Sequence, residues 1–181
     1  YMPSGTMSNQ VAICCQTEPG DEILIDSQAH CYFYESGAAA ALAGVTCRLL
    51  AGKRGIFTAQ DVKAALRPEN YHFPPTKLLC IENAHNRGGG SIWPLGIVAE
   101  VAAVAKEANL KLHLDGARLW NASAASGISE KQYAECFDSV SVCFSKGLGA
   151  PVGSALAGSA ELMNRARRFR KQFGGGMRQA G

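Results

Sequence analysis

The sequence predicts an α/β fold, in which a mainly parallel sheet is covered by helices. Two observations support this prediction. Short apolar runs alternate with stretches of helical spacing along the chain, and no period of about 20–50 residues recurs, as it would in a repeat protein. The chain has 181 residues, of which 47% are hydrophobic, and this suffices for a domain with a packed core.

Charge and cysteine content argue against several classes of function. The net charge of +3 is too small for the basic footprint of a nucleic-acid-binding protein, and no apolar run reaches the roughly 20 residues of a membrane span. The seven cysteines are odd in number and include no CxxC pair. They are expected to be reduced core residues of a cytoplasmic protein rather than a disulfide framework or a metal cluster.

Five short apolar runs are predicted to form the strands of the sheet. The run from Lys111 to Asp115 ends on an acid, and Ser139 to Cys143 alternates polar and apolar residues with the period of a strand. In parallel sheets ligands bind beyond the carboxyl ends of the strands, so chemistry is expected just after these runs. The predicted strands are Ile23–Asp26, Val45–Leu50, Leu78–Glu82, Lys111–Asp115 and Val140–Phe144.

Helix start signals stand between these runs. Thr58 with Asp61, and Ser129 with Gln132, have the spacing of a capping box, and Pro94 suits a first helical turn. A final helix is predicted over Glu161–Phe173. Its basic residues form either a solvated face or a contact with another subunit.

Several well-known catalytic motifs are absent. The sequence has no GxxxxGK[ST], GxSxG or HExxH, which argues against P-loop enzymes, simple serine hydrolases and zincins. Gly147, Gly149 and Gly153 do not have the spacing of GxGxxG.

Four segments carry residues suited to chemistry, and each has an ordinary structural alternative. Gly5 and Thr6 stand at a helix start, where free N–H groups and a hydroxyl can bind a phosphate, or where the helix is simply capped. His30 follows a predicted strand by four residues. It can stack on a ring or transfer a proton, or it can be a structural histidine.

The other two segments are Asp115–Arg118 and a glycine-rich loop around Lys146. Asp115 can hold a proton on a heterocyclic nitrogen and Arg118 can bind a carboxylate, unless the two side chains simply pair. Lys146 follows an apolar strand, a place that suits a Schiff-base lysine beside a cofactor or, alternatively, a solvent-exposed turn.

Together, these residue types in this order specify pyridoxal 5′-phosphate. Lys146 would form the imine, Asp115 would pair with the pyridine nitrogen, and Gly5 with Thr6 would hold the phosphate. No metal is expected.

The same segments resemble the low-specificity L-threonine aldolases, a family in the β-eliminating lyase group of fold-type I pyridoxal-phosphate enzymes. The resemblance spans essentially the whole chain, and the lysine loop and the last segment are its most specific parts. The matching segments are Ser4-Gly5-Thr6-Met7, His30, Glu82-Asn83-Ala84-His85-Asn86, Asp115-Gly116-Ala117-Arg118, Ser145-Lys146-Gly147-Leu148-Gly149 and Gly174-Gly175-Gly176-Met177-Arg178-Gln179.

The resemblance implies a fold and an assembly. Residues 1–181 would be the cofactor-binding large domain, which is similar to that of aminotransferases. They would be an internal segment of a longer polypeptide, without its N-terminal segment and its small C-terminal domain. The family also implies a homotetramer whose active sites are shared between neighbouring subunits.

Individual roles follow from the matching motifs. Lys146 resembles the catalytic lysine that binds the cofactor, and His30 resembles the histidine stacked on the cofactor ring. Arg118 resembles the arginine near the cofactor oxygen and the substrate carboxylate. Arg178 resembles the arginine that reaches a neighbouring subunit's cofactor phosphate. His72 stands where the family has a histidine near the substrate hydroxyl.

The implied reaction is reversible cleavage of L-threonine or L-allo-threonine to glycine and acetaldehyde. His30, or a water that it orients, is the candidate base for the β-hydroxyl proton, with His72 assisting. Two alternatives stay open. One is a related lyase acting on another β-hydroxy amino acid such as phenylserine, and the other is a non-catalytic interaction domain whose basic helix binds an acidic partner.

Overall fold

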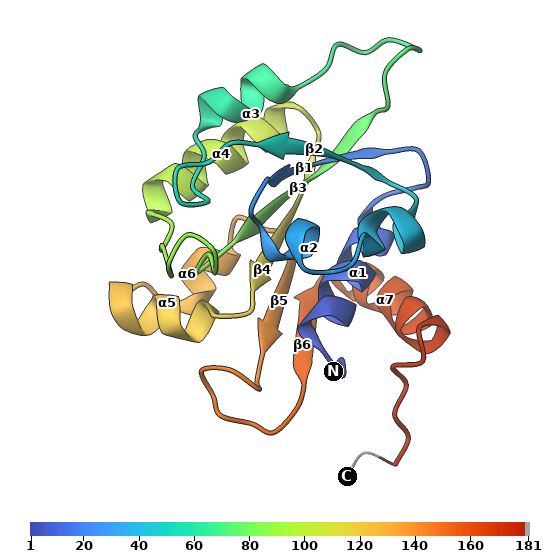
Figure 1. The fold of residues 1–181 in the computed structure, drawn as a ribbon, viewed down its shortest axis with the longest axis vertical. Helices are drawn as coiled ribbons and strands as arrows, with labels where there is room; N and C mark the ends of the chain where they lie inside the picture. Colours follow the sequence, from blue (N-terminus) through green and yellow to red (C-terminus); the bar gives the residue numbers. More distant parts are fainter. Residues whose placement is uncertain (180–181) are drawn as a thin grey trace.

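A six-stranded sheet forms the centre of the computed structural model, which describes residues 1–179 (Figure 1). The strand order is β2-β1-β3-β4-β5-β6, and every neighbouring pair is parallel except β5 and β6. The α/β prediction is therefore confirmed. The strands are β1 (Glu22–Asp26), β2 (Thr46–Leu50), β3 (Thr76–Glu82), β4 (Lys111–Gly116), β5 (Ser139–Cys143) and β6 (Ser154–Gly158).

Helices cover both faces of this sheet. Two capping boxes are formed as predicted, one at Thr58 with Asp61 and one at Ser129 with Gln132. Pro94 is the N-cap rather than the first helical residue. The helices are α1 (Gly5–Gln16), α2 (His30–Phe33), α3 (Ala59–Ala65), α4 (Leu95–Glu107), α5 (Leu119–Ser126), α6 (Glu130–Ala134) and α7 (Ala160–Gln172), with a π-helical turn, η1, at Ala39–Ala43.

The sixth strand is missing from the sequence prediction. Strand β6 lies at the edge of the sheet and pairs with β5 alone, antiparallel to it. Its residues belong to a run rich in glycine and alanine, which lacks the β-branched and aromatic residues typical of strands. The hairpin partner supplies the pairing that this composition does not indicate.

The strands send alternate side chains to two different cores. One face packs Leu24, Leu79 and Ile81 against α3 and α4, and Trp93 meets Phe57 edge-on there, with ring centroids 4.8 Å apart. The other face packs its residues against α1 and η1, and a third cluster joins α1 to α7 and β6. Figure 1 shows α3 with α4, and α1 with α7, as these two separate layers.

The amino-terminal end of α1 lies at the carboxyl edge of the sheet. Met2 pairs with Ser154 through two backbone hydrogen bonds of 2.8 and 2.9 Å, and Ser154 begins β6 beside the end of β5. Strands β3 and β4 end in register at this same edge, with Glu82 beside Asp115. One edge therefore gathers the segments on which the sequence places its chemistry.

All seven cysteines are free thiols, and five of them are buried. Burial raises the pKa of both Cys14 and Cys15 to about 11, so these thiols stay protonated at neutral pH. No helix among residues 1–179 is long and apolar enough to span a membrane.

Candidate active site

Asp115 is a buried carboxylate that no lysine or arginine of the described residues neutralises. Its residue is 2% exposed. Oδ1 accepts the Ala117 N–H at 3.1 Å, and Oδ2 accepts from Asn9 Nδ2 at 2.9 Å and from the Cys31 thiol at 3.4 Å. Within residues 1–179 no lysine or arginine forms an ion pair with it, so the simple pairing with Arg118 is not formed. A buried charge of this kind is costly unless a cation compensates it.

The start of α1 offers unpaired donors at the same edge. Ser4 Oγ accepts the Met7 N–H at 3.1 Å, which caps the helix. The N–H groups of Gly5 and Thr6 meet no acceptor in the part of the chain that the structure describes. A Cβ on Gly5 would lie 2.9 Å from Cys143 Sγ, so glycine lets the helix approach the end of β5. This helix end can bind an anion such as phosphate.

Lys146 lies on the loop that joins β5 to β6. The base of the loop is held by the Phe144 N–H, which donates to the Gly153 carbonyl at 3.0 Å, and Gly149 N–H closes a turn on the Lys146 carbonyl. A Cβ on Gly147 would lie 2.6 Å from Asn121 Oδ1, so the loop packs closely on α5. Lys146 is exposed and without an ion-pair partner among residues 1–179, which leaves its amine free to react.

Lys146 and Arg118 share a cleft of about 680 Å³. Arg118 is the N-cap residue of α5 and is half-buried. A Cβ on Gly116 would lie 2.7 Å from the Ser141 carbonyl, so glycine permits the turn that leads from Asp115 to Arg118. The cleft is lined by Ala84, Gly90, Ile92, Arg118, Asn121, Ala125, Lys146 and Gly147.

His30 is held from two sides at the start of α2. Its backbone N–H donates to Glu82 Oε2 at 2.8 Å, and its Nδ1 lies 3.0 Å from Glu35 Oε1. Because a carboxylate accepts only, Nδ1 carries the proton and Nε2 is the free nitrogen. The hydrogen bond to Glu35 raises the pKa of His30 above its ordinary value. The neighbouring Asp115 acts in the same direction.

Several buried polar residues of the site were missed by sequence reasoning. Asn9, Glu35 and His113 are all buried, and Asn9 touches the other two as well as Asp115. Their signal in the sequence is weak, namely polar residues that interrupt apolar stretches.

His85, which stands in one of the matching segments, is fully buried. Its Nδ1 accepts the Gly88 N–H at 3.0 Å, and its Nε2 lies 3.3 Å from Asp26 Oδ1. A Cβ on Gly55 would overlap the His85 ring. The ring thus fills the space between loops that follow three different strands.

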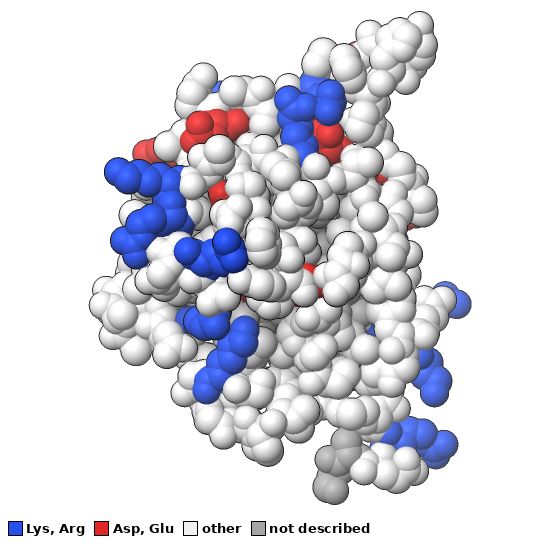
Figure 2. All heavy atoms as spheres, in the orientation of Figure 1, with Lys and Arg blue, Asp and Glu red and all other residues white. Residues whose placement is uncertain are grey.

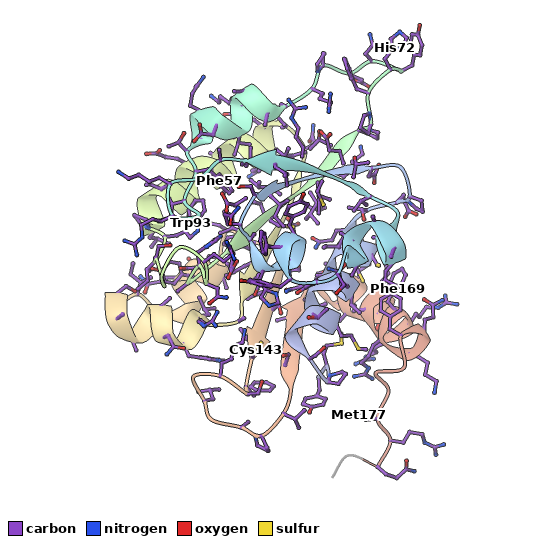
Figure 3. The ribbon with its side chains drawn as sticks, in the orientation of Figure 1. Phe57, His72, Trp93, Cys143, Phe169 and Met177 are labelled. Atoms are coloured by element: carbon purple, nitrogen blue, oxygen red, sulfur yellow. The ribbon has the colours of Figure 1, made fainter. Side chains whose placement is uncertain are left out.

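The structure does not bring His72 to these residues within one chain. His72 is exposed at the tip of the segment before β3, which Figure 3 shows as a projecting loop. That loop lies at the amino end of β3, whereas Asp115 lies beside Glu82 at its carboxyl end. A strand of seven residues at about 3.3 Å per residue separates the two edges.

Arg178 also lies apart from the cleft. After α7, Gly174 adopts a φ of +78°, and buried Gly175 packs directly against Met7 at the start of α1. The chain then leads past Met177 and away from the body of the molecule (Figure 3). Arg178 is exposed.

The basic residues of α7 are partly engaged within the chain. Arg165 pairs with Glu18 at 3.3 Å and Arg170 donates to the Tyr1 carbonyl at 3.0 Å. Arg167, Arg168 and Lys171 are exposed.

Two further clefts contain none of the predicted site residues. One of about 610 Å³ lies at the amino ends of the strands, between Lys77, Lys111 and Arg165, and one of about 770 Å³ lies beside Tyr71 and Phe73.

Comparisons with known proteins show the family and the fold of this chain. The sequence profile of the beta-eliminating lyases matches residues 1–181. The low specificity L-threonine aldolase of Escherichia coli strain K12 is 41% identical over the whole chain, which covers 54% of that protein. The threonine aldolase structure from Leishmania major superposes with a TM-score of 0.87 at 26% identity, over 96% of this chain and 51% of that one.

The fold is shared more widely. An aspartate aminotransferase double mutant of Thermus thermophilus superposes with a TM-score of 0.70 at 16% identity, over 95% of this chain and 44% of that one, which shows likeness of fold alone. The chain spans about half the length of the curated relatives that it matches.

Proposed function

Because the chain belongs to the beta-eliminating lyase family, we propose that it is the cofactor-binding large domain of a pyridoxal-phosphate-dependent aldolase. Its substrate would be L-threonine or L-allo-threonine, cleaved reversibly to glycine and acetaldehyde. The carbon–carbon lyase activity is supported by relatives named low-specificity L-threonine aldolase that match the whole chain.

The residues present fit the cofactor. The buried carboxylate of Asp115, which pairs with no lysine or arginine within residues 1–179, suits a protonated ring nitrogen. The N–H groups of Gly5 and Thr6 suit a phosphate, and Lys146 suits the aldehyde. When bound, the cofactor supplies an electron sink for the charge that is released as the Cα–Cβ bond breaks.

The chain's own residues would then bind the substrate and move its proton. Arg118 offers a guanidinium fork to the substrate carboxylate in the cleft that it shares with Lys146. His30 presents a free Nε2, because Glu35 occupies Nδ1. We assign to His30, directly or through a water, removal of the β-hydroxyl proton.

The roles of His72 and Arg178 would be fulfilled between copies of the chain. Both are exposed. His72 lies on the projecting loop, and Arg178 follows Met177 in the segment that leads away from the body (Figure 3), so a neighbouring subunit would receive His72 near its substrate hydroxyl and Arg178 at its cofactor phosphate. The central face in Figure 2 is largely uncharged. Exposed Tyr32, Phe33 and Leu42 come from α2 and η1, which lie in front in Figure 1. An apolar face of this kind suits a subunit contact in a homotetramer.

The observation that carries the proposal is the unpaired, buried Asp115 at the edge that also holds Lys146 and the start of α1. The test is to incubate the native polypeptide that contains these residues with pyridoxal 5′-phosphate and to measure glycine and aldehyde formed from L-threonine, L-allo-threonine and phenylserine. Faster cleavage of the threonines is expected. A holoenzyme that binds the cofactor but cleaves no β-hydroxy amino acid would overturn the assignment, and a preference for phenylserine would favour the related lyase.

A further inference from the structure

Asn9 connects two buried carboxylates with one amide group. Its Nδ2 donates to Asp115 Oδ2 at 2.9 Å and to Glu35 Oε1 at 3.0 Å, and the residue is 2% exposed. The two contacts come from different parts of the site, since Asp115 lies near the end of β4 and Glu35 follows α2. One side chain therefore touches both the candidate cofactor carboxylate and the carboxylate that holds His30.

The two carboxylates need such a donor. Donor and acceptor atoms of His30, Glu35 and Asp115 lie within 4.8 Å of one another, and the Glu35 side chain is 0% exposed. Like charges at this range repel strongly where water is excluded. Each carboxylate also has donors of its own. Glu35 accepts from Gln10 at 2.6 Å and from His30 Nδ1 at 3.0 Å, and Asp115 accepts from the Ala117 N–H at 3.1 Å and the Cys31 thiol at 3.4 Å. Asn9 is the donor that the two carboxylates share.

His113 fixes the orientation of the Asn9 amide. Asn9 Oδ1 lies 3.1 Å from His113 Nε2, and His113 Nδ1 lies 2.8 Å from Ser139 Oγ. Burial lowers the pKa of His113 to about 4, so its ring is neutral at neutral pH. Because the Asn9 oxygen must accept, the single ring proton of His113 is on Nε2.

The hydrogen bonds continue from His113 to Ser139 and Gln16. Ser139 donates its hydroxyl hydrogen to His113 Nδ1 and accepts from Gln16 Nε2 at 2.7 Å. In the series that runs from Gln16 through Ser139, His113 and Asn9 to the two carboxylates, each group therefore donates to the next one. Turning the Asn9 amide over would face its oxygen toward both carboxylates and toward nothing that donates.

We propose that Asn9 is a positioning residue that joins the two functional halves of the site, holding Asp115 toward the cofactor ring and Glu35 toward His30. The proposal rests on the proposed function only in taking Asp115 as the cofactor's partner. A residue that merely filled space would affect folding, whereas a shared donor changes the behaviour of both carboxylates in the folded protein.

Gln10 provides a matched control, because it is a neighbouring buried amide that donates to Glu35 but to no atom of Asp115. The variants are Asn9→Ala and Gln10→Ala in the holoenzyme. One readout is the cofactor: its dissociation constant and the pH midpoint of its absorbance. The other is His30: the pH midpoint of its labelled ring by NMR in the protein without substrate, where Glu35, Asp115 and Glu82 are the charged groups that face it.

Asn9→Ala is expected to move both readouts. Cofactor affinity should fall at least about tenfold, the lower end of the range for loss of a hydrogen bond to a charged group, because Asp115 is no longer held toward the ring, and the absorbance midpoint should shift. The His30 midpoint should rise, because a carboxylate with one donor fewer holds the histidine proton more tightly. Gln10→Ala should raise the His30 midpoint and leave the cofactor readouts unchanged.

Two outcomes would overturn the proposal. One is a folded Asn9→Ala protein that is unchanged in both readouts, and the other is equal cofactor loss in Gln10→Ala. If Asn9→Ala does not fold, Asn9→Ser decides, since a hydroxyl donates to one carboxylate at a time: a change in at least one readout is expected, and no change refutes the shared role. A wild-type protein that binds no cofactor would contradict the proposed function instead. The NMR titration of His30 in the Asn9 variants would still test the role of Asn9.

Discussion

His30 Nδ1 lies 3.0 Å from Oε1 of Glu35, whose side chain is completely buried. This contact orients the imidazole and keeps its proton on the nitrogen that faces the protein interior. It also raises the pKa of His30, so the charge of the candidate base depends on a residue that the solvent does not reach.

Replacing Glu35 should move the pH dependence of activity. A general base works when it is deprotonated. The midpoint pH of the acid limb of the kcat/KM profile should therefore follow the pKa of His30. Glu35→Gln removes the group that raises this pKa, and the limb should shift to lower pH. Measured pH profiles of the two proteins check this, and an unshifted limb would mean that another group is the base.

The same contact affects stability with a definite sign. The folded-state pKa of His30 is raised, so its contribution to stability is fully present below the ordinary value of about 6.5 and is lost as the pH rises through the folded-state pKa. The loss of stability in Glu35→Gln should therefore be greater at pH 5.5 than at pH 8.5, as thermal unfolding at about these two pH values would test.

Lys146→Ala should abolish covalent attachment of the cofactor. Without the amine, borohydride reduction should leave no cofactor mass on the peptide that contains residue 146, and turnover should fall at least about a thousandfold, as for loss of a catalytic nucleophile. Lys111→Ala, which changes an exposed lysine paired with Asp138, is the control. It should keep the covalently attached cofactor and the turnover of the wild type. Turnover like that of the wild type in Lys146→Ala would rule out the mechanism.

Asp115→Asn should weaken the cofactor's electron sink while the pocket keeps its shape. A neutral amide cannot hold the ring nitrogen protonated, and an opposite charge at such range favours the protonated form by about 1.4–4 kcal/mol. Turnover should fall at least about tenfold, since 1.4 kcal/mol is a factor of ten, with the cofactor still bound. Steady-state kinetics with an absorbance titration measures both, and unchanged turnover would remove Asp115 from the site.

Arg178→Ala should loosen both the cofactor and the assembly of the full-length enzyme. An arginine fork on a phosphate is a charge-assisted contact, so its loss should release cofactor on dilution, and added cofactor should partly restore the oligomer by mass action. Size-exclusion chromatography at several cofactor concentrations tests this. Arg167→Ala removes an equal charge from the exposed side of α7 and should behave like the wild type. If Arg178→Ala also keeps its cofactor and its oligomer, the assignment of Arg178 to a site shared between subunits is wrong.

Gly55→Ala should destabilise the fold through His85. The new Cβ would overlap the buried imidazole, and Gly55 has a φ of +82°, so the expected loss is about 3 kcal/mol from backbone strain and overpacking together. Gly127→Ala, with a φ of +72° and no atom near its Cβ, should lose only the backbone part, about 1–2 kcal/mol. Denaturant unfolding compares the two, and equal losses would mean that the His85 ring moves aside.

Local signals predicted the parts of this structure that neighbouring residues determine. The capping boxes at Thr58 and Ser129, and the five parallel strands, follow from residues a few positions apart. The edge on which Asp115 and Lys146 stand follows from the rule that parallel strands end together. These inferences need no knowledge of distant contacts.

The remaining features depend on contacts that the sequence pattern does not encode. Asn9 meets Glu35 across 26 residues and Asp115 across 106, and an asparagine in an apolar helix gives no sign of either partner. The place of His72 depends on how far the loop before β3 projects, and its motif match says nothing of that distance. Strand β6 is specified by its pairing with β5 rather than by its own composition.

The position of α1 has a consequence for how the protein reaches its native state. This helix precedes all six strands, yet the segment before it pairs with Ser154, and Asn9 is bonded to His113 and Asp115. Contacts of such high sequence separation form slowly, because a long loop must close before they contribute. During synthesis α1 must therefore wait until the β5–β6 hairpin has emerged. Competence to bind the cofactor therefore requires this hairpin, and cofactor uptake by a refolding chain would measure the docking of α1 on the hairpin rather than the formation of either element alone.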